Sequence, residues 1–371
     1  MNTIRHGVKA ATAWSVHYSG LRPLLAAAGR LRAGGRRVMM VSYHRVVDNF
    51  QREVARSIPG LLISQRTLRR QLEQAHACGY EFATLEQALE VLAGRKAAEK
   101  DLFVVTFDDA YADAFEYGAP VLKQMGVPAI MYVPVGFVGT RKRFDHDRLF
   151  HLLRRLSGHQ ALYAQSGLGR WLERVRRGQS SLSQVLDDFI AHHPREKLLV
   201  AIDELEKLLQ NEGPLLPSSG AVMTWEQVRE WLRLGFDVGA HTVHHVVLPQ
   251  LSRTEQQAEI AHSRKELERQ TGCRVKDFAY CNGWYSPQVI ELLVEEGFRS
   301  AVTTEDLPNA VRGDPYRLKR KVLWENFSLS FGNYSPALTA CHLDDVFGVL
   351  KASRPVYGDA SVHAQLAGKH A

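Results

Sequence analysis

The stretch "VVTFDDAYADAF", Val104 to Phe115, decides the fold class of this chain of 371 residues. Its apolar, β-branched run ends in two neighbouring carboxylates, Asp108 and Asp109. Successive side chains of a strand point to opposite faces, so a charged pair directly after a buried run indicates that the backbone has left the sheet. Parallel α/β folds place their chemistry at this rim. An isolated pair of this kind is also typical of a helix cap with a solvated neighbour, so it decides the function only together with other residues.

Strand patterns alternate with helix patterns on both sides of this stretch. Apolar runs typical of buried strands cover residues 36–46, 102–107, 127–135, 236–242, 277–283 and 298–304. Amphipathic helix patterns fall between them at residues 64–79, 115–126, 224–235, 252–272 and 286–297. Ser64 is a predicted helix cap, and Ser252 with Glu255 forms a predicted capping box. This alternation predicts an α/β fold with a parallel sheet or barrel.

The alternation divides the chain into four parts. Residues 1–37 form a basic, amphipathic segment, and residues 38–330 form the α/β body. Residues 140–219 interrupt this body with helix patterns and no convincing strand, so we expect a helical insertion there. Residues 331–371 are weakly patterned and are treated as a tail.

The formal net charge of +7 comes from one end of the chain. The first 47 residues carry eight basic side chains and no acidic one, whereas the remainder has 39 basic and 40 acidic side chains. No basic face interleaved with aromatic residues occurs in this balanced body, so we expect no nucleic-acid partner. The four cysteines show no CxxC spacing, which argues against a thiolate zinc site and against a secreted disulfide scaffold. A reducing, cytoplasmic compartment is the expectation.

The basic segment has neither the apolar core of a signal peptide nor a stretch long enough to span a membrane. Its aromatic and leucine side chains, with basic neighbours, are typical of an amphipathic helix that lies on an anionic membrane surface. A basic helix packed against its own domain explains the same pattern equally well. The sequence therefore leaves two interpretations, a peripheral anchor on the inner membrane face and an internal packing element.

Three histidines follow the predicted strand at residues 236–242, in the sequence "GAHTVHHVV". His241 and His245 are four residues apart, and on a helical turn this spacing would place both imidazoles on one face, where they can bind one metal ion. His244 is three residues from the first. The pattern is weak evidence when it stands alone, but its place directly after a strand strengthens it.

The two motifs meet if both strands belong to one parallel barrel. Their carboxyl ends then open on the same rim, where Asp108 or Asp109 can join His241 and His245. Two imidazoles and one carboxylate leave coordination positions open, which is typical of a catalytic rather than a structural metal site. The second carboxylate would lie beside the metal ligand, in a suitable place to accept a proton from a water molecule.

With these motifs in order, the chain resembles the polysaccharide deacetylases of the NodB-homology type, carbohydrate esterase family 4. The resemblance covers most of residues 38–330 and rests on "YHRV", "TFDDAY", "GAHTVHH" and "FAYCNG", followed by "GFRSAVTT". It implies a distorted (β/α) barrel with fewer than eight repeats. It also implies that Asp108 is the catalytic base and that Asp109, His241 and His245 bind a divalent metal ion, usually zinc.

This chain departs from the family pattern at several positions. The glycine usual after the acid pair is Ala110, and Ala279 stands where one branch of the family has the arginine that supports the base. Cys281 replaces a proline and is either a small buried residue or an additional thiolate ligand. The usual general acid is not visible, and His342 is only a weak candidate.

Four further residues are candidates for the substrate pocket, namely His44, Tyr280, Asn282 and Arg320. His44 ends a predicted strand, where a purely structural hydrogen bond is equally typical. Arg320 either steadies Asp108, binds substrate, or belongs to a solvated basic run. At the start of the insertion, we expect an ion pair between Asp147 and Arg148.

The resemblance implies a metal-dependent hydrolase that removes N-acetyl groups from an amino-sugar polysaccharide or its precursor, as in exopolysaccharide biosynthesis. Two alternatives remain open at this point. The first is a deacetylase or deformylase of a lipid-linked amino sugar, which the basic segment would suit. The second is a carbohydrate-binding protein that kept the barrel and lost turnover, which the replacements at Ala279 and Cys281 would suit.

Overall fold

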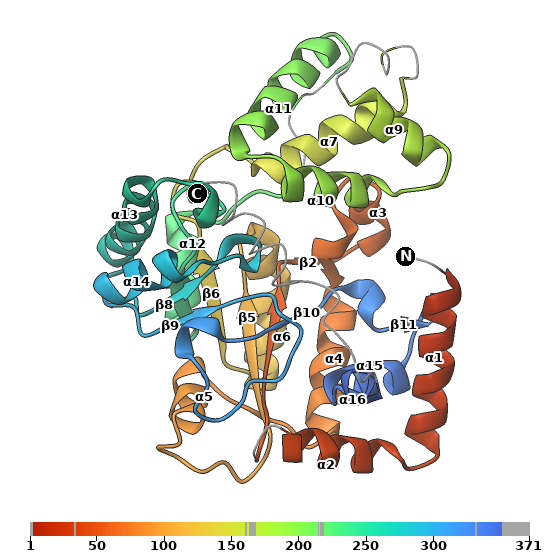
Figure 1. Ribbon diagram of the computed structural model, residues 1–371, viewed down its shortest axis with the longest axis vertical. Coiled ribbons are helices and arrows are strands. Elements are labelled where there is room, and N and C mark those ends of the chain that lie inside the picture. The colour runs from red at the N-terminus through yellow and green to blue at the C-terminus, as the bar shows by residue number, and fades with distance from the viewer. Residues whose placement is uncertain are drawn as a thin grey trace.

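The computed structural model describes residues 3–32, 35–159, 162, 168–213, 215, 219–330 and 332–350. Its centre is a curled sheet of eight parallel strands (Figure 1). The strands are β1 (Val38–Tyr43), β4 (Glu81–Phe82), β5 (Leu102–Phe107), β6 (Ala129–Val133), β7 (Asp237–Ala240), β8 (Asp277–Ala279), β9 (Ser300–Val302) and β10 (Lys321–Val322). They follow the order β10-β1-β5-β6-β7-β8-β9, with β4 beside β5. A parallel bridge between Val302 and Leu318 brings the two ends of this row together. The prediction of a distorted barrel with fewer than eight repeats is confirmed.

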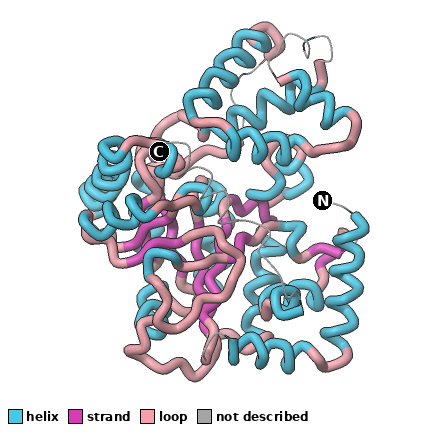
Figure 2. Tube along the Cα trace, in the orientation of Figure 1, coloured by secondary structure: helices cyan, strands magenta, loops and turns pink. Residues whose placement is uncertain are grey.

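Helices cover the outside of the sheet (Figure 2). They are α3 (Phe50–Val54), α4 (Gln65–Ala77), α5 (Leu85–Leu92), α6 (Ala119–Met125), α12 (Trp225–Arg233), α13 (Arg253–Thr271) and α14 (Pro287–Glu295). The Ser64 hydroxyl accepts a hydrogen bond from the Thr67 N–H, and Ser252 forms the reciprocal capping box with Glu255, as the sequence predicts. The strands β1 and β5 are buried along their whole length, because helices cover one face and the barrel interior fills the other.

Several short elements connect these layers. Two parallel strands, β2 (Arg45–Val47) and β3 (Leu62–Ser64), form a small separate sheet. Single turns of 3₁₀-helix occur at Pro59–Leu61, Leu248–Gln250, Cys281–Gly283, Pro315–Arg317 and Glu325–Phe327, and a π-helical turn occurs at Ala114–Gly118.

The helical insertion forms a separate layer at the carboxyl ends of the strands (Figure 1). It contains α7 (Asp145–Ser157), α9 (Gly169–Arg176), α10 (Leu182–His192) and α11 (Arg195–Leu209). These helices share a core of their own, in which Leu152, Leu172, Val185 and Ile202 are fully buried. The insertion therefore packs as a unit above the rim on which the sequence motifs converge.

The basic N-terminal segment folds into α1 (Thr3–Tyr18) and α2 (Arg22–Arg32). Ala13 and Val16 pack against Leu338, Cys341 and Val346. These partners lie in or beside α15 (Pro336–Leu343) and α16 (Val346–Leu350), which follow the short hairpin β11 (Leu329–Ser330) and β12 (Asn333–Tyr334). Residues 332–350 thus form ordered structure that the weak sequence pattern does not predict, and residues 351–371 of the predicted tail lie outside the described residues.

Candidate active site

The turn after β5 separates the two neighbouring carboxylates. Asp109 has φ 71° and Ala110 has φ 51°, so the chain makes two consecutive left-handed residues directly after the strand. The family's glycine would adopt this conformation freely, whereas a side chain at each position costs about 1–2 kcal/mol. Ala110 in place of the family's glycine is a small change only where the backbone needs no positive φ, and here the backbone does need one. The turn places Asp108 and Asp109 against different partners.

Asp108 is held by a buried arginine. The Arg320 side chain has no solvent exposure, and its guanidinium donates from Nη1 to Asp108 Oδ1 at 2.7 Å and from Nη2 to Oδ2 at 2.8 Å. Ser42 Oγ adds a hydrogen bond to Oδ2 at 3.0 Å. Burial alone would raise the pKa of Asp108, but the charge and hydrogen bonds of Arg320 outweigh it and hold the pKa below its ordinary value. Asp108 is therefore ionised at neutral pH.

Arg320 supplies the support for Asp108 that the family pattern would place at residue 279. Of the interpretations that the sequence left open for this residue, the geometry supports the one in which it steadies Asp108, and a solvated basic run is wrong because the side chain is fully buried. The guanidinium reaches Asp108 from the segment just before β10, whereas Ala279 lies at the end of β8. An arginine from another part of the chain thus provides the support that Ala279 cannot provide.

Replacing Arg320 by methionine should destabilise the fold by about 3–5 kcal/mol, because it leaves the buried Asp108 carboxylate without its cation. Urea unfolding measures this change. Arg317→Met is the matched control, since Arg317 is half exposed and pairs with Asp314 on the surface, where such a pair is worth about 0–1 kcal/mol. Equal unfolding midpoints for the two variants would show that the pair with Asp108 is not the main role of Arg320.

Asp109 faces the two histidines that the sequence singles out. Its Oδ1 atom lies 3.4 Å from His241 Nε2 and 3.1 Å from His245 Nε2, and all three side chains are buried or nearly so. Within the described part of the chain, this buried oxygen accepts no hydrogen bond. Burial would raise the pKa of Asp109, yet the charge of His245 and the adjacent His241 hold it well below its ordinary value.

These three side chains fit a divalent metal ion. Zinc binds imidazole nitrogen and carboxylate oxygen at about 2.1 Å, so tetrahedral ligands lie about 3.4 Å from one another, close to the two separations observed. His241 Nδ1 is 2.7 Å from the carbonyl oxygen of Ala279, a contact that places the proton on Nδ1 and leaves Nε2 free as a ligand. A buried carboxylate oxygen without a hydrogen bond, facing two imidazole nitrogens, is the arrangement that a cation completes.

The two histidines do not lie on a helical turn, contrary to the sequence expectation. Residues 241–245 form a loop after β7 in which Thr242 has φ 61° and His245 has φ 51°. These left-handed residues turn the chain back, so that His245 approaches Asp109 although the segment is not helical. The intervening His244 points elsewhere and pairs with Glu259, with its Nδ1 2.6 Å from Oε1.

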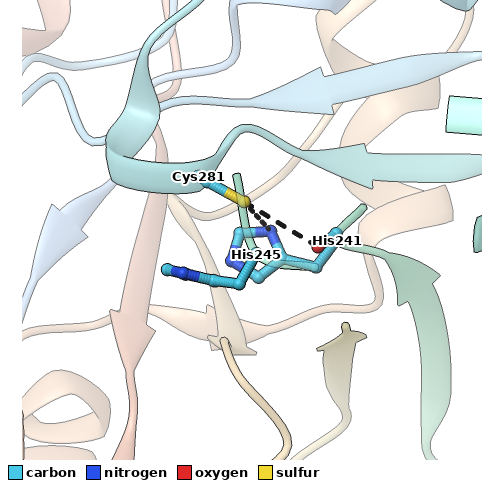
Figure 3. Close-up of side chains that lie close together, drawn as sticks. All are labelled: His241, His245 and Cys281. Carbon is cyan, nitrogen blue, oxygen red and sulfur yellow. Dashed lines mark hydrogen bonds between the residues drawn. The ribbon is translucent and has the colours of Figure 1, made fainter. Parts of the chain in front are cut away.

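Cys281 lies close to the same histidines (Figure 3). Donor atoms of His241, His245 and Cys281 all lie within 4.8 Å of one another, so this trio is a second possible ligand set. The thiol is fully buried, and its Sγ is 3.9 Å from His241 Nδ1 and 3.8 Å from the His241 carbonyl oxygen. It therefore approaches the side of His241 opposite to Nε2, the atom near Asp109. Its burial matches the small-residue interpretation, and its proximity keeps the thiolate interpretation open.

Two aromatic rings of the insertion pack against His245. Phe144 is fully buried, with its ring centroid 5.1 Å from that of His245, and it stacks on His146 at 5.2 Å. His146 Nε2 lies 3.1 Å from the Tyr111 hydroxyl, which donates to Asp147 at 2.8 Å. Burial lowers the pKa of His146 to about 3, so this ring stays neutral. Phe144 and His146 lie at the start of the insertion, beside Asp147 and Arg148, but their contact with His245 was not predicted.

The expected ion pair between Asp147 and Arg148 is wrong. Asp147 accepts a hydrogen bond from Tyr111, whereas Arg148 pairs with Glu206 at 2.7 Å. The reason is helical geometry, since neighbouring residues of α7 point in different directions and Arg148 turns toward α11.

The remaining pocket candidates fall into different places. His44 follows β1, and its Nε2 lies 4.0 Å from Asp108 Oδ2. Its Nδ1 is buried without a hydrogen bond to any described residue. Tyr280 is buried and donates its hydroxyl hydrogen to the Tyr316 carbonyl, so it supports the barrel instead of lining the pocket. His342, the weak candidate for a general acid, packs in the α15 layer between Phe327 and Phe347.

A shallow, open cleft lies beside this centre, between the insertion and the barrel. The insertion contributes Asp145, His146, Ile190, His193, Arg195 and Leu198, and the barrel contributes His244, His245, Val246, Val247, Gln250 and Asn282. Asp145 and Arg195 form an ion pair, with Arg195 Nη2 2.9 Å from Asp145 Oδ2. Asn282 is thus the one of the four pocket candidates that lines this cleft.

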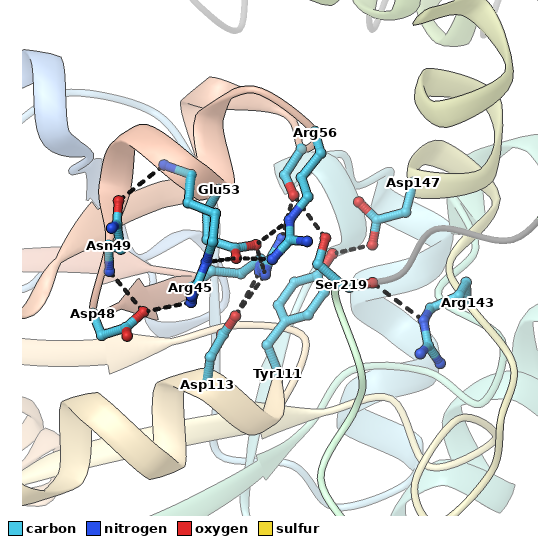
Figure 4. Close-up of polar contacts among 12 residues, drawn as sticks. Arg45, Asp48, Asn49, Glu53, Arg56, Tyr111, Asp113, Arg143, Asp147 and Ser219 are labelled. Carbon is cyan, nitrogen blue, oxygen red and sulfur yellow. Dashed lines mark hydrogen bonds and ion pairs between the residues drawn. The ribbon is translucent and has the colours of Figure 1, made fainter. Parts of the chain in front are cut away.

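A buried polar network holds the base of the insertion against the barrel (Figure 4). Arg45, from the "YHRV" motif, donates to Asp113 at 2.8 Å and to the Ser57 hydroxyl at 2.8 Å. The Ser57 hydroxyl is 3.0 Å from that of Ser219, whose carbonyl accepts a hydrogen bond from Arg143. Arg143 and Ser219 are the two ends of the insertion, so this network fixes its position above the site.

Known proteins resemble this chain in sequence and in fold. A family model described as "Polysaccharide deacetylase" matches residues 201–301, which include His241, His245 and Cys281. The homologue YxkH of Bacillus subtilis (strain 168), itself described as a polysaccharide deacetylase, is 21% identical over 277 residues, covering 74% of this chain and 70% of that protein.

Two solved structures share the fold. The Streptococcus pyogenes deacetylase PplD, in complex with acetate, aligns with a TM-score of 0.53 at 17% identity, covering 85% of this chain and 98% of that one. IcaB from Ammonifex degensii aligns with a TM-score of 0.53 at 20% identity, covering 84% and 98%.

Proposed function

Because the chain belongs with the polysaccharide deacetylases in both sequence and fold, we propose that it is a metal-dependent hydrolase that removes N-acetyl groups from an amino-sugar glycan. The observation that carries this proposal is the position of the two neighbouring carboxylates. Asp109 faces His241 and His245, whereas Asp108 is held ionised beside them by Arg320. One carboxylate can therefore bind a metal ion while the other stays free of it.

We assign the metal to Asp109, His241 and His245, with zinc as the expected ion. The chemistry that a divalent ion supplies when bound there is Lewis acidity, toward an amide carbonyl and toward a water molecule. Amide hydrolysis also requires a base to take a proton and an acid to give one to the leaving amine.

Asp108 is the proposed base. It is ionised, and Arg320 and Ser42 fix its carboxylate in one orientation. Because the guanidinium is bidentate and its own Nε donates to the Thr303 carbonyl at 2.9 Å, the carboxylate has little freedom to turn away from the site. This restriction keeps a proton acceptor in place, which is the main contribution that a positioned base makes.

His44 is the proposed donor of a proton to the leaving amine. Its Nε2 lies 4.0 Å from Asp108 Oδ2, and burial lowers the pKa of His44, so the neutral ring would first take up the proton that Asp108 accepts and then give it to the amine. The position of His44 follows from β1, whose end is adjacent to the end of β5 in the parallel sheet.

The ion pair of Arg320 with Asp108 argues against a carbohydrate-binding protein that lost turnover, because Arg320 supplies the support missing at Ala279.

The cleft under the insertion is the proposed place for the sugars next to the N-acetyl group. Its lining combines aliphatic side chains with amides and imidazoles, which suits the apolar faces and hydroxyl groups of a glycan. The half-buried ion pair between Asp145 and Arg195 is internally balanced, so the cleft does not demand a charged sugar.

The test of this function is product analysis with a panel of N-acetylated glycans and lipid-linked amino sugars. Acetate and free amine should appear in equal amounts, and only when the protein carries metal. An O-acetylated sugar of matched length is the control for ester hydrolysis. Binding of the glycans without any acetate or formate would instead identify the protein as a carbohydrate-binding relative.

A bulky side chain in the cleft should weaken the binding of long substrates and leave the turnover of short ones unchanged. Ile190→Trp places an indole among the cleft residues, so we expect the KM for an N-acetylglucosamine oligomer to rise about 10-fold or more. The kcat for a monomeric substrate should be unchanged, because the catalytic residues are untouched. Val200→Trp, on the exposed face of α11, is the control that adds the same side chain outside the cleft. Identical KM values for Ile190→Trp and Val200→Trp would place the glycan elsewhere.

A further inference from the structure

Exposed apolar side chains are concentrated at the N-terminus. Among the described residues, nine large apolar side chains are exposed, and six of these lie between residues 8 and 31. They are Val8, Trp14, Tyr18, Leu21, Leu24 and Leu31, which we call the apolar corner. The other three, Val200, Val294 and Leu307, are scattered over separate elements. Single exposed apolar residues are ordinary, whereas a concentration of this kind marks an interaction surface.

The apolar corner is a face of folded helices. In α1, Ala13 and Val16 are buried against α15, whereas Trp14 and Tyr18 lie on the opposite side, 64% and 62% exposed. The two rings are neighbours, with centroids 5.3 Å apart, as the spacing of four residues on a helix requires. In α2, Leu24 and Leu31 are 67% and 84% exposed, and their spacing of seven residues places them on one face of that helix.

Internal ion pairs hold the corner in place. Arg22 pairs with Asp344, Arg30 lies 3.2 Å from Asp101, and Arg37 contacts both carboxylates at 3.0 and 3.1 Å. The packing interpretation that the sequence left open is therefore observed for residues 3–32. It leaves the outer, apolar face of the same helices without a partner among the described residues.

The positive charge of residues 1–37 indicates which kind of partner binds the apolar corner. Residues 1–37 contain seven cations and no acid, and three of these cations, Arg22, Arg30 and Arg37, share the two carboxylates of Asp101 and Asp344. A net positive charge therefore remains around the apolar corner. A second copy of the chain would bring an equally positive segment against it, which like-charge repulsion opposes. An anionic surface that accepts apolar side chains is complementary in both respects.

We propose that the apolar corner is a docking surface for an anionic lipid bilayer. Trp14 and Tyr18 are the residue types that enter the headgroup region, and the leucines of α2 reach the acyl boundary beside them. Among the described helices, none is long and apolar enough to cross a membrane. This inference is independent of the proposed reaction, because lipid binding requires none of the catalytic residues.

Vesicle co-sedimentation of the full-length protein tests the docking surface. We expect binding to phosphatidylcholine vesicles that contain phosphatidylglycerol, weaker binding without the anionic lipid, and release at high salt. The double variant Trp14→Ser/Leu24→Ser should bind at least about 10-fold more weakly. Val200→Ser/Val294→Ser is the matched control, because it removes two equally exposed apolar residues outside the corner and should bind like the wild type.

Thermal unfolding of each variant verifies that the fold is intact, and Leu31→Asp, at the 84% exposed position, is a second variant if the first is destabilised. The proposal is overturned if the wild-type protein stays in the supernatant with anionic vesicles, or if the corner variants bind as tightly as the control. A wild-type dimer that the corner variants convert to monomer, without vesicle binding, would assign the face to a second copy and would equally overturn it.

Discussion

Replacing Asp109 by alanine is expected to remove the bound metal ion together with the deacetylase activity. The variant keeps two protein ligands, His241 and His245, and a site with two ligands is weak. Removing only an outer partner of a metal ligand costs 10- to 100-fold in affinity, so loss of a ligand itself should cost more than about 100-fold. Metal content after dialysis, measured by mass spectrometry, tests this loss of metal affinity directly. His241→Ala and His245→Ala should behave in the same way.

Cys281→Ala is the control that separates the two candidate ligand sets. The thiol lies beside Nδ1 of His241, away from the Nε2 atom that faces Asp109, so its removal should leave the metal content near that of the wild type. Cobalt-loaded protein provides a second readout, because a thiolate ligand adds an absorption band that Cys281→Ala would abolish. Retained metal in Asp109→Ala with loss in Cys281→Ala would reassign the site to the two histidines and the thiol.

Replacing Asp108 by asparagine should leave the metal in place and reduce turnover by about 10²- to 10⁴-fold. An amide cannot accept a proton at neutral pH, and a positioned base typically contributes a factor of this size. The ligands Asp109, His241 and His245 are unchanged, so the metal content should match that of the wild type. Substantial activity in the loaded variant would show that another group is the base.

Asp108→Asn also leaves Arg320 buried without its carboxylate, so a control for stability is needed. Asp277→Asn provides it, since Asp277 is buried at the start of β8 and pairs with Arg299 at 2.9 Å. It lies at the opposite end of the strand from the site. The control should lose stability, although less than Asp108→Asn because Arg299 is partly exposed and also pairs with Glu86, and it should keep its turnover. Unchanged turnover would show that a broken ion pair in the barrel does not by itself remove activity.

The fold was predictable from the sequence because it depends on short-range patterns. The apolar run 102–107, the cap at Ser64 and the capping box at Ser252 each correspond to an element in the structure. Two motifs that follow strands, "TFDDAY" and "GAHTVHH", were placed on one rim by the rule that parallel strands end on the same side. That rule requires only that both strands run parallel in one sheet, which the alternation of strand and helix patterns predicts.

The long-range contacts were not predictable in the same way. The sequence left open whether Arg320 steadies Asp108, 212 residues away, and could not decide it, because the pairing depends on β10 lying beside β1. Ser42 was missed for the same reason, as its hydroxyl reaches Asp108 across two adjacent strands. The contact of Phe144 with His245 depends on how the insertion is seated, and no periodic pattern records that.

The loop at 241–245 shows a different limit. A spacing of four residues indicates a shared helical face only if the segment is helical, and here left-handed residues at Thr242 and His245 produce the same convergence by another route. Thr is β-branched and rarely adopts a positive φ, so propensity argued against this conformation at Thr242. The contact between His245 and Asp109 accounts for the loop conformation, whereas the local preferences of its residues do not.

Metal content and the rate of acetate release, measured on the same dialysed sample of wild-type protein, test the central claim most directly. We predict that the protein stripped by a chelator releases no acetate from an N-acetylglucosamine oligomer, and that activity returns in proportion to bound zinc up to one ion per chain. Acetate release by the metal-free protein at the rate of the loaded protein would contradict a site built on Asp109, His241 and His245.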